Sequence, residues 1–230
     1  MMIRRPFDLL LGVAVLVSVT SCAKVAGIED AQLDKSAAPS TCDTYCDAVN
    51  SLCDSPANAP PPNPQYSVYE SQDMCVAVCQ LIPTGSPGDT SGNSIYCRLN
   101  KVAQSSGEKK GYCSAAGPGG TGNFDDAGVP SLKCGDSACS SYCLLLQQSC
   151  PTEYASQFPL GFGDCLDQCN KLPSFGDYNI SQEDGPSSIN CRLYHVSAAI
   201  VTGAITPATD DSRAAHATHC GHATGAPPCN

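Results

Sequence analysis

The sequence predicts an all-α protein made of two tandem, disulfide-stapled helical units of about three helices each, which follow a lipoprotein signal peptide. Three observations predict this. The 230-residue chain has 17 cysteines, no tryptophan and few aromatic residues, so disulfides must supply stability that a large apolar core would otherwise give. The cysteines fall into two series with matching local patterns. Their spacing follows the period of a helix rather than that of a strand.

The first 21 residues have the features of a signal peptide. Arg4 and Arg5 supply the positive start, and the apolar run Leu9–Val19 is too short to span a bilayer. The run leads into the tetrapeptide VTSC, which resembles the bacterial lipobox. That resemblance implies that Cys22 is lipidated and becomes the first residue of the mature chain, with residues 22–41 as a tether.

Ordinary cleavage before Cys22 is the alternative, because Val19 and Ser21 also suit a signal peptidase that leaves the cysteine unmodified. Cysteine parity favours lipidation, since 17 is odd and setting Cys22 aside leaves an even number that can pair completely. Acyl chains on Cys22 would anchor the protein to a lipid bilayer. Ala23 follows the cysteine, which favours sorting to the outer membrane.

Export and charge narrow the classes of function. An exported chain meets an oxidising compartment, where cysteines form disulfides in preference to metal sites. The formal net charge of −10 argues against nucleic acid as a partner. The chain contains no C-x-x-C motif, which excludes thioredoxin-type redox chemistry and the haem-attachment motif.

The cysteines after Cys22 fall into two series of eight, which define the predicted units 42–134 and 135–230. The first series is Cys42, Cys46, Cys53, Cys75, Cys79, Cys97, Cys113 and Cys134. The second series is Cys139, Cys143, Cys150, Cys165, Cys169, Cys191, Cys220 and Cys229.

Two patterns predict the first two helices of each unit. C-x3-C-x2-[VL]-x3-C begins at Cys42 and Cys139, and C-x3-C-x2-[IL]-P begins at Cys75 and Cys165. These spacings place the cysteines on one stripe of a helix, whereas a strand would divide them between two faces. One of the hydroxyl residues at 40–41 is expected to cap the first helix. The proline of the second pattern is expected to end its helix.

A third pattern, I-x-C-R-L, surrounds Cys97 and Cys191 and predicts a third helix. In the second copy the apolar stripe and Cys191 lie on opposite faces, so we expect this helix to be covered on both sides. The arginine after each cysteine is expected to form an ion pair within its unit rather than to bind an anion. The candidate pairs are Arg98 with Asp89 and Arg192 with Asp184.

Helices that each carry C-x3-C can lie antiparallel and be joined twice. This predicts four staples, each contributing about 2–4 kcal/mol: Cys42–Cys79, Cys46–Cys75, Cys139–Cys169 and Cys143–Cys165. The remaining cysteines would then pair as Cys53–Cys97, Cys113–Cys134, Cys150–Cys191 and Cys220–Cys229. Eight cysteines can pair in many other ways, so alternatives stay open.

The units differ in the segments between their cysteines. Ser55–Pro64 is rich in proline and predicts an exposed loop. The stretch 117–122, GPGGTG, predicts a flexible linker. Variable loops on a stapled scaffold are where binding function usually lies.

The lipobox, the VAGIED segment at 25–30 and the two cysteine units together resemble a group of cysteine-rich lipoproteins predicted in myxobacteria. The likeness covers nearly all of the chain after the signal peptide. It implies the compartment and the repeat, and it implies no activity. Each unit is also similar in size to plant lipid-transfer proteins. The adjacent Cys-Cys and the C-x-C of that family are absent, so its lipid cavity is not expected here.

The histidines are the candidate metal ligands, and all four lie in the second unit: His195, His216, His219 and His222. The stretch HATHCGH sets three of them around Cys220, and imidazoles at such spacing can bind zinc or copper. His195 would join them if Cys220 were tied to the third helix. The alternative is a set of polar residues around a disulfide, because the first unit has Lys101 and Tyr112 where His195 and His219 fall.

Catalytic patterns are weaker. Gly-Asp-Ser at 135–137 resembles the opening of a serine esterase motif, and residues 89–92 approximate an aspartic protease loop, but turn and cap chemistry accounts for both. We therefore expect a non-enzymatic, cofactor-free binding or structural module of the cell envelope, with an unknown protein or envelope ligand as partner. The alternatives are a metal or haem carrier that uses the four histidines, and an envelope hydrolase.

Overall fold

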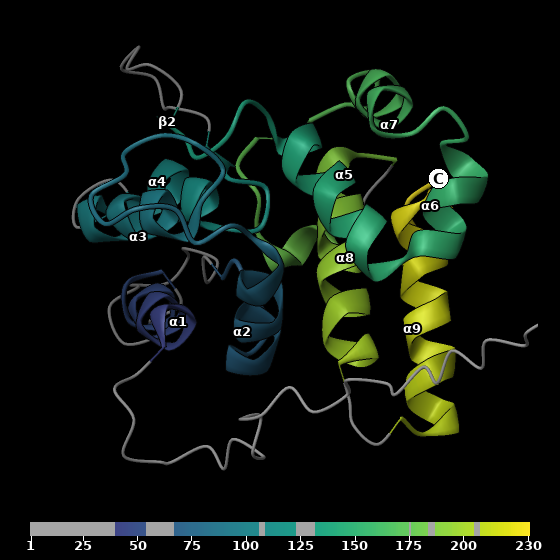
Figure 1. The fold of residues 1–230 in the computed structure, drawn as a ribbon, viewed down its shortest axis with the longest axis horizontal. Helices are drawn as coiled ribbons and strands as arrows, with labels where there is room; N and C mark the ends of the chain where they lie inside the picture. The colour runs from purple at the N-terminus through teal and green to yellow at the C-terminus, as the bar shows by residue number, and fades with distance from the viewer. Residues whose placement is uncertain are drawn as a thin grey trace, which may run out of the picture. The chain divides into compact units, whose positions relative to one another are not determined.

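The structure, a computed structural model, describes residues 40–53, 67–105, 109–122, 132–174, 176–183, 187–204 and 208–230. This part of the chain is mostly helical and rich in disulfides, which confirms the predicted all-α, disulfide-stapled class (Figure 1). The signal peptide, Cys22, the tether as far as residue 39 and the proline-rich loop lie outside these ranges. Within them, no helix has the length and apolar character that a bilayer span requires.

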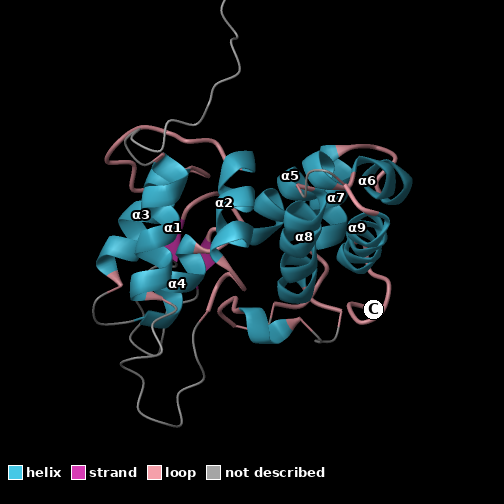
Figure 2. Ribbon diagram, turned by 90° about the horizontal axis from the view of Figure 1, so that it is seen from below, coloured by secondary structure: helices cyan, strands magenta, loops and turns pink. Residues whose placement is uncertain are grey.

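The helices and strands follow the order of the cysteines. The first half of the chain contains α1 (Thr41–Leu52), α2 (Gln72–Leu81), α3 (Ile95–Gln104), α4 (Lys109–Ala116), β1 (Thr121–Gly122) and β2 (Leu132–Lys133). The second half contains α5 (Ala138–Ser149), α6 (Pro151–Gln157), α7 (Phe162–Cys169), the short 3₁₀ helix η2 (Ile180–Gln182), α8 (Ile189–Gly203) and α9 (Asp210–Ala223). The antiparallel pair β1–β2, with Thr121 opposite Lys133, is the sheet structure in the described ranges (Figure 2).

Serine caps begin five of these helices. In each, the serine hydroxyl accepts a hydrogen bond from the backbone N–H three residues later, which satisfies a donor that the helix itself cannot. The caps are Ser40, Ser71, Ser94, Ser137 and Ser188. Ser40 confirms the predicted cap of the first helix. The predicted proline stops are also confirmed, because α2 ends at Leu81 and α7 at Cys169, each before its proline.

The four predicted staples are confirmed, and the other four predicted pairs are wrong. The staples join α1 to α2 and α5 to α7 through Cys42–Cys79, Cys46–Cys75, Cys139–Cys169 and Cys143–Cys165. In place of the predicted Cys53–Cys97, Cys113–Cys134, Cys150–Cys191 and Cys220–Cys229, the structure has Cys53–Cys113, Cys97–Cys134, Cys150–Cys220 and Cys191–Cys229.

A fourth cysteine-bearing helix in each half, α4 or α9, explains this error. The second half also contains α6, so the prediction of about three helices per unit is corrected. The seventh cysteine lies on α4 or on α9. Helix α4 packs on α3, and α9 packs along α8. This packing brings the seventh cysteine beside Cys53 or Cys150, at the end of the first helix of its half. The eighth cysteine then bonds to the cysteine of the third cysteine-bearing helix, α3 or α8.

The halves are joined through α2. This helix packs against α8 and α5, and residues 39–230 form one compact unit. The division into units 42–134 and 135–230 therefore stays a prediction. Helix α8 is covered by α2, α5 and α9, and its side chains from Ile189 to Ile200 are buried except that of Arg192, which is half-buried. This confirms that the third helix of the second half is covered on both sides.

The glycine-rich stretch 117–122 is not a flexible linker, so that prediction is wrong. Residues 117–120 are buried and form a turn after α4. Gly120 has φ +67°, and a Cβ there would lie 2.4 Å from the carbonyl oxygen of Cys134 and 2.7 Å from a guanidinium nitrogen of Arg98. Glycine is needed because the backbone passes so close to both groups.

Candidate functional site

Three of the four histidines converge where α8 and α9 lie side by side (Figure 1). His195 comes from the middle of α8 and is 5% exposed. His219 and His222 are three residues apart on α9, a spacing that puts both side chains on the same face of the helix. Both are half-buried. The three residues are called the histidine cluster below.

The ring nitrogens of the cluster approach closely. His195 Nδ1 lies 3.1 Å from His219 Nδ1. The His195 and His222 rings meet edge to face with their centroids 4.6 Å apart. One potential ligand nitrogen from each residue lies within 4.8 Å of the other two. The Nδ1 atom of His222 is buried and has no hydrogen-bond partner.

His216, the fourth predicted ligand, lies outside this cluster. Its Nδ1 is 2.8 Å from the carbonyl oxygen of Ala199, and its Nε2 is 3.6 Å from Cys220 Sγ. That sulfur is already bonded to Cys150. The condition set for His195 to join, a bond from Cys220 to the third helix, is not met, because Cys220 pairs with Cys150 at the end of α5. His195 joins the cluster through the packing of α8 on α9.

Burial and nearby charges act on His219. Burial lowers its pKa, as do the neighbouring His222 and His216, while the negative charge of Glu70 acts in the opposite direction. The Glu70 carboxylate accepts a hydrogen bond of 3.2 Å from the hydroxyl of Tyr194. Sequence reasoning missed Glu70, because it lies far from the histidines along the chain and in no recognisable motif.

Arg98 has a structural role, and its predicted ion pair with Asp89 is wrong. The Arg98 side chain is fully buried. It donates to the carbonyl oxygens of Gly117 and Pro118, which follow the end of α4, and also to Ser94 O and Ser141 Oγ. A cation is favourable at a helix C-terminus, where carbonyls lack helical partners.

Asp89 and Arg192 take comparable local roles. The Asp89 carboxylate accepts hydrogen bonds from Ser86 N and Ser94 Oγ in its own turn. Arg192 donates to the carbonyl oxygen of Thr224, directly after α9, at 3.2 Å. Its predicted partner Asp184 lies outside the described residues. Both arginines thus bind the end of the fourth cysteine-bearing helix of their half, α4 or α9.

The catalytic candidates are also engaged in local structure. Ser137 forms a reciprocal cap with Ser140 at the start of α5. Asp89, in the protease-like segment, holds its own turn as described above. The observed contacts are those of turn and cap chemistry.

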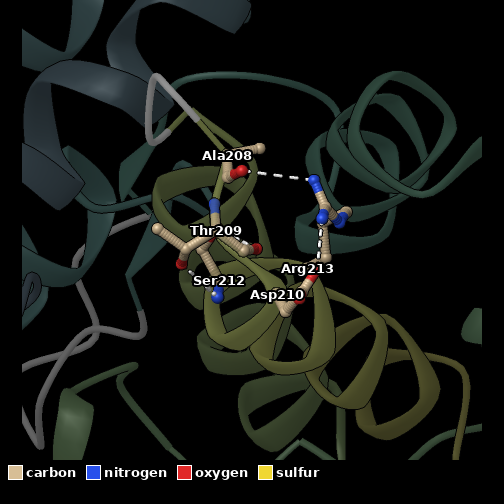
Figure 3. A network of polar contacts seen from close by, with 5 residues as sticks. All are labelled: Ala208, Thr209, Asp210, Ser212 and Arg213. Carbon is tan, nitrogen blue, oxygen red and sulfur yellow. Dashed lines mark hydrogen bonds and ion pairs between the residues drawn. The ribbon is translucent and has the colours of Figure 1, made fainter.

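A cavity of about 570 Å³ lies between α2, α5, α8 and α9. Apolar side chains such as Leu81 and Ile200 line it together with Gln80, Gln148, Arg213 and His216. Figure 3 shows Arg213 beside the start of α9, where it forms an ion pair with Asp210 and donates to Ala208 O at 3.2 Å. Volumes of this size suit small organic ligands.

Comparisons with protein-family models, with curated proteins and with solved structures find no match for this chain.

Proposed function

We propose that this chain is a cell-envelope lipoprotein, anchored to a bilayer through acylated Cys22. Its stapled helical part is a non-enzymatic binding or structural module for a protein or other ligand of the envelope. Outer-membrane sorting is part of the same proposal.

One observation carries the anchor. The chain has 17 cysteines, and the eight disulfides use all of them from Cys42 to Cys229. Cys22 is therefore the one cysteine that these bonds do not use. Lipidation needs a free thiol, so the pairing of every other cysteine and the signal-peptide pattern before Cys22 support this assignment.

Two further observations support a binding module over a hydrolase. Ser137 and Asp89, the residues of the catalytic patterns, serve as a helix cap and a turn. The cavity between α2, α5, α8 and α9 is large enough for a small ligand and combines apolar walls with a few polar side chains.

Mass spectrometry of the protein from native membranes, without reduction, tests this proposal. We expect a mature chain that begins at an acylated Cys22 and contains eight disulfides. The variant Cys22→Ser should leave the membrane fraction while its disulfides stay intact. A mature chain with an unmodified Cys22 would contradict the anchor. Labelling of a serine by a fluorophosphonate probe would favour the hydrolase.

A further inference from the structure

We propose that the histidine cluster, His195, His219 and His222, binds one divalent transition-metal ion of the zinc or copper class. This inference goes beyond the anchored module proposed above, and it rests on the geometry of α8 and α9 alone. Neutral imidazoles are ligands that suit both metals.

The spacing of the nitrogens fits a metal. Two nitrogens bound to a tetrahedral zinc ion at about 2.0–2.1 Å lie about 3.3 Å apart. His195 Nδ1 and His219 Nδ1 are 3.1 Å apart. One ring nitrogen from each of the three histidines also lies within 4.8 Å of one from each of the other two. A small adjustment of one side chain would therefore complete the site.

The hydrogen bonding of the imidazole rings is also consistent with a bound metal ion. The contact between His195 and His219 engages one nitrogen of each of those rings. The buried Nδ1 of His222 has no hydrogen-bond partner. A buried polar atom without a partner is costly, and a metal ion would satisfy it.

The fold does not depend on imidazoles at these positions. In the first half the corresponding residues are Lys101 and Tyr112, and the same disulfide order forms around them. The packing of the scaffold therefore does not by itself explain why histidines occupy these three positions. Since eight disulfides already hold the helices, the metal would be a bound ligand rather than the element that folds the chain.

The burial of the ligands indicates exchangeable binding. His195 is buried, whereas His219 and His222 are partly exposed. Three protein ligands leave a tetrahedral ion one position open to water or to an incoming group. These features suit a site that takes up and releases metal.

Titration of the full mature protein tests the site. The protein is purified without an affinity tag, stripped with a chelator and titrated separately with Zn²⁺ and Cu²⁺ by calorimetry. We expect one equivalent of metal to bind. His219→Gln and His222→Gln should each weaken binding by about 100-fold or more, because loss of even an outer-shell partner costs about 10–100-fold.

His216→Gln is the matched control, because it changes a histidine of the same helix that lies outside the cluster. Its metal affinity should equal that of the unmodified protein. Circular dichroism and a disulfide count on each variant separate loss of a ligand from loss of the fold. If the unmodified protein binds no stoichiometric metal, or if His216→Gln weakens binding as much as His219→Gln does, the site is overturned. Neither result bears on acylation of Cys22.

Discussion

Residues 42–134 and residues 139–229 pair their cysteines in the same order. In each half the first bonds to the fifth, the second to the fourth, the third to the seventh and the sixth to the eighth. The side chains placed on this framework differ. Where the second half has His195 on its third helix, the first has Lys101, whose Nζ donates to Thr90 O at 2.9 Å. The same disulfide pattern thus positions a lysine that donates a structural hydrogen bond in one half and a histidine cluster in the other.

The support of the fourth helix is shared as well. The hydroxyl of Tyr45 donates to Ala116 O at the end of α4, and that of Tyr142 donates to Ala223 O at the end of α9. An arginine then binds the carbonyl of the next residue in each half. The tyrosine and the arginine that recur in the two halves therefore have the same role. They donate hydrogen bonds to the carbonyl oxygens at the end of α4 or α9. The disulfides, the tyrosines and the arginines are thus common to both halves and build the scaffold, whereas the histidine cluster belongs to the second half.

Removal of the disulfide that ties the fourth helix should have the largest effect. Cys53→Ala/Cys113→Ala opens a loop of 60 residues, and Cys150→Ala/Cys220→Ala opens one of 70 residues. The chain-entropy cost of about 4 kcal/mol should be nearly equal in the two variants. Denaturant unfolding without reductant measures it. Costs that differ by more than about 2 kcal/mol would show that the halves are not energetically equivalent.

Removal of the arginines should distinguish the halves. Arg98→Ala should lower the free energy of unfolding by about 3 kcal/mol, because it leaves several buried acceptors without a donor. Arg192→Ala should cost about 1 kcal/mol, since Arg192 is only half-buried. Urea unfolding of both variants gives the two values. Equal losses would mean that burial of the guanidinium does not set its contribution.

Removal of the tyrosine hydroxyls should cost less. Tyr45→Phe and Tyr142→Phe each delete one buried hydrogen bond to a helix end, so each should lose about 1 kcal/mol of stability. The rings stay in place, although Tyr45→Phe also removes the 3.0 Å contact between the Tyr45 and Tyr69 hydroxyls. The same unfolding assay applies. A loss confined to one half would break the proposed equivalence of the two helix ends.

Raising the pH above about 10 should lower the free energy of unfolding, whereas stability at neutral pH should be unaffected by these tyrosines. Burial raises the pKa of Tyr142 and raises that of Tyr178 well above its ordinary value of 10. A raised pKa in the folded state contributes stability that is full below about pH 10 and is lost as pH rises through the folded-state pKa. Phenolate absorbance and circular dichroism, followed together, should therefore change in one step above pH 10. Ionisation of these tyrosines without unfolding would contradict their burial.

The elements that sequence reasoning predicted correctly are those with local causes. The C-x3-C helices, the cap at Ser40 and the proline stops depend on residues a few positions apart. The remaining disulfides depend on where α4 and α9 pack, which no local spacing specifies. A signal for α9 was nevertheless present, because Thr209 and Ser212 form a reciprocal cap before the helix.

The candidate site was predictable in part for the same reason. The spacing of His219 and His222 is local, and the helix α9 puts both on one face, but sequence reasoning predicted no helix there. The inclusion of His195 and the exclusion of His216 depend on the packing of α8 and on the bond from Cys220 to Cys150. Glu70 and the cavity depend on contacts between distant segments, so the sequence contained no pattern for them.

The overlap of the disulfide loops has a consequence for resistance to proteases. The spans 42–79, 53–113 and 97–134 overlap without a gap, as do 139–169, 150–220 and 191–229. A single cut anywhere inside either half therefore leaves its fragments covalently joined. Between Cys42 and Cys229, only the segment from Cys134 to Cys139 lies outside every span. A protein built in this way can be cut once in a loop of either half and still keep its fragments together.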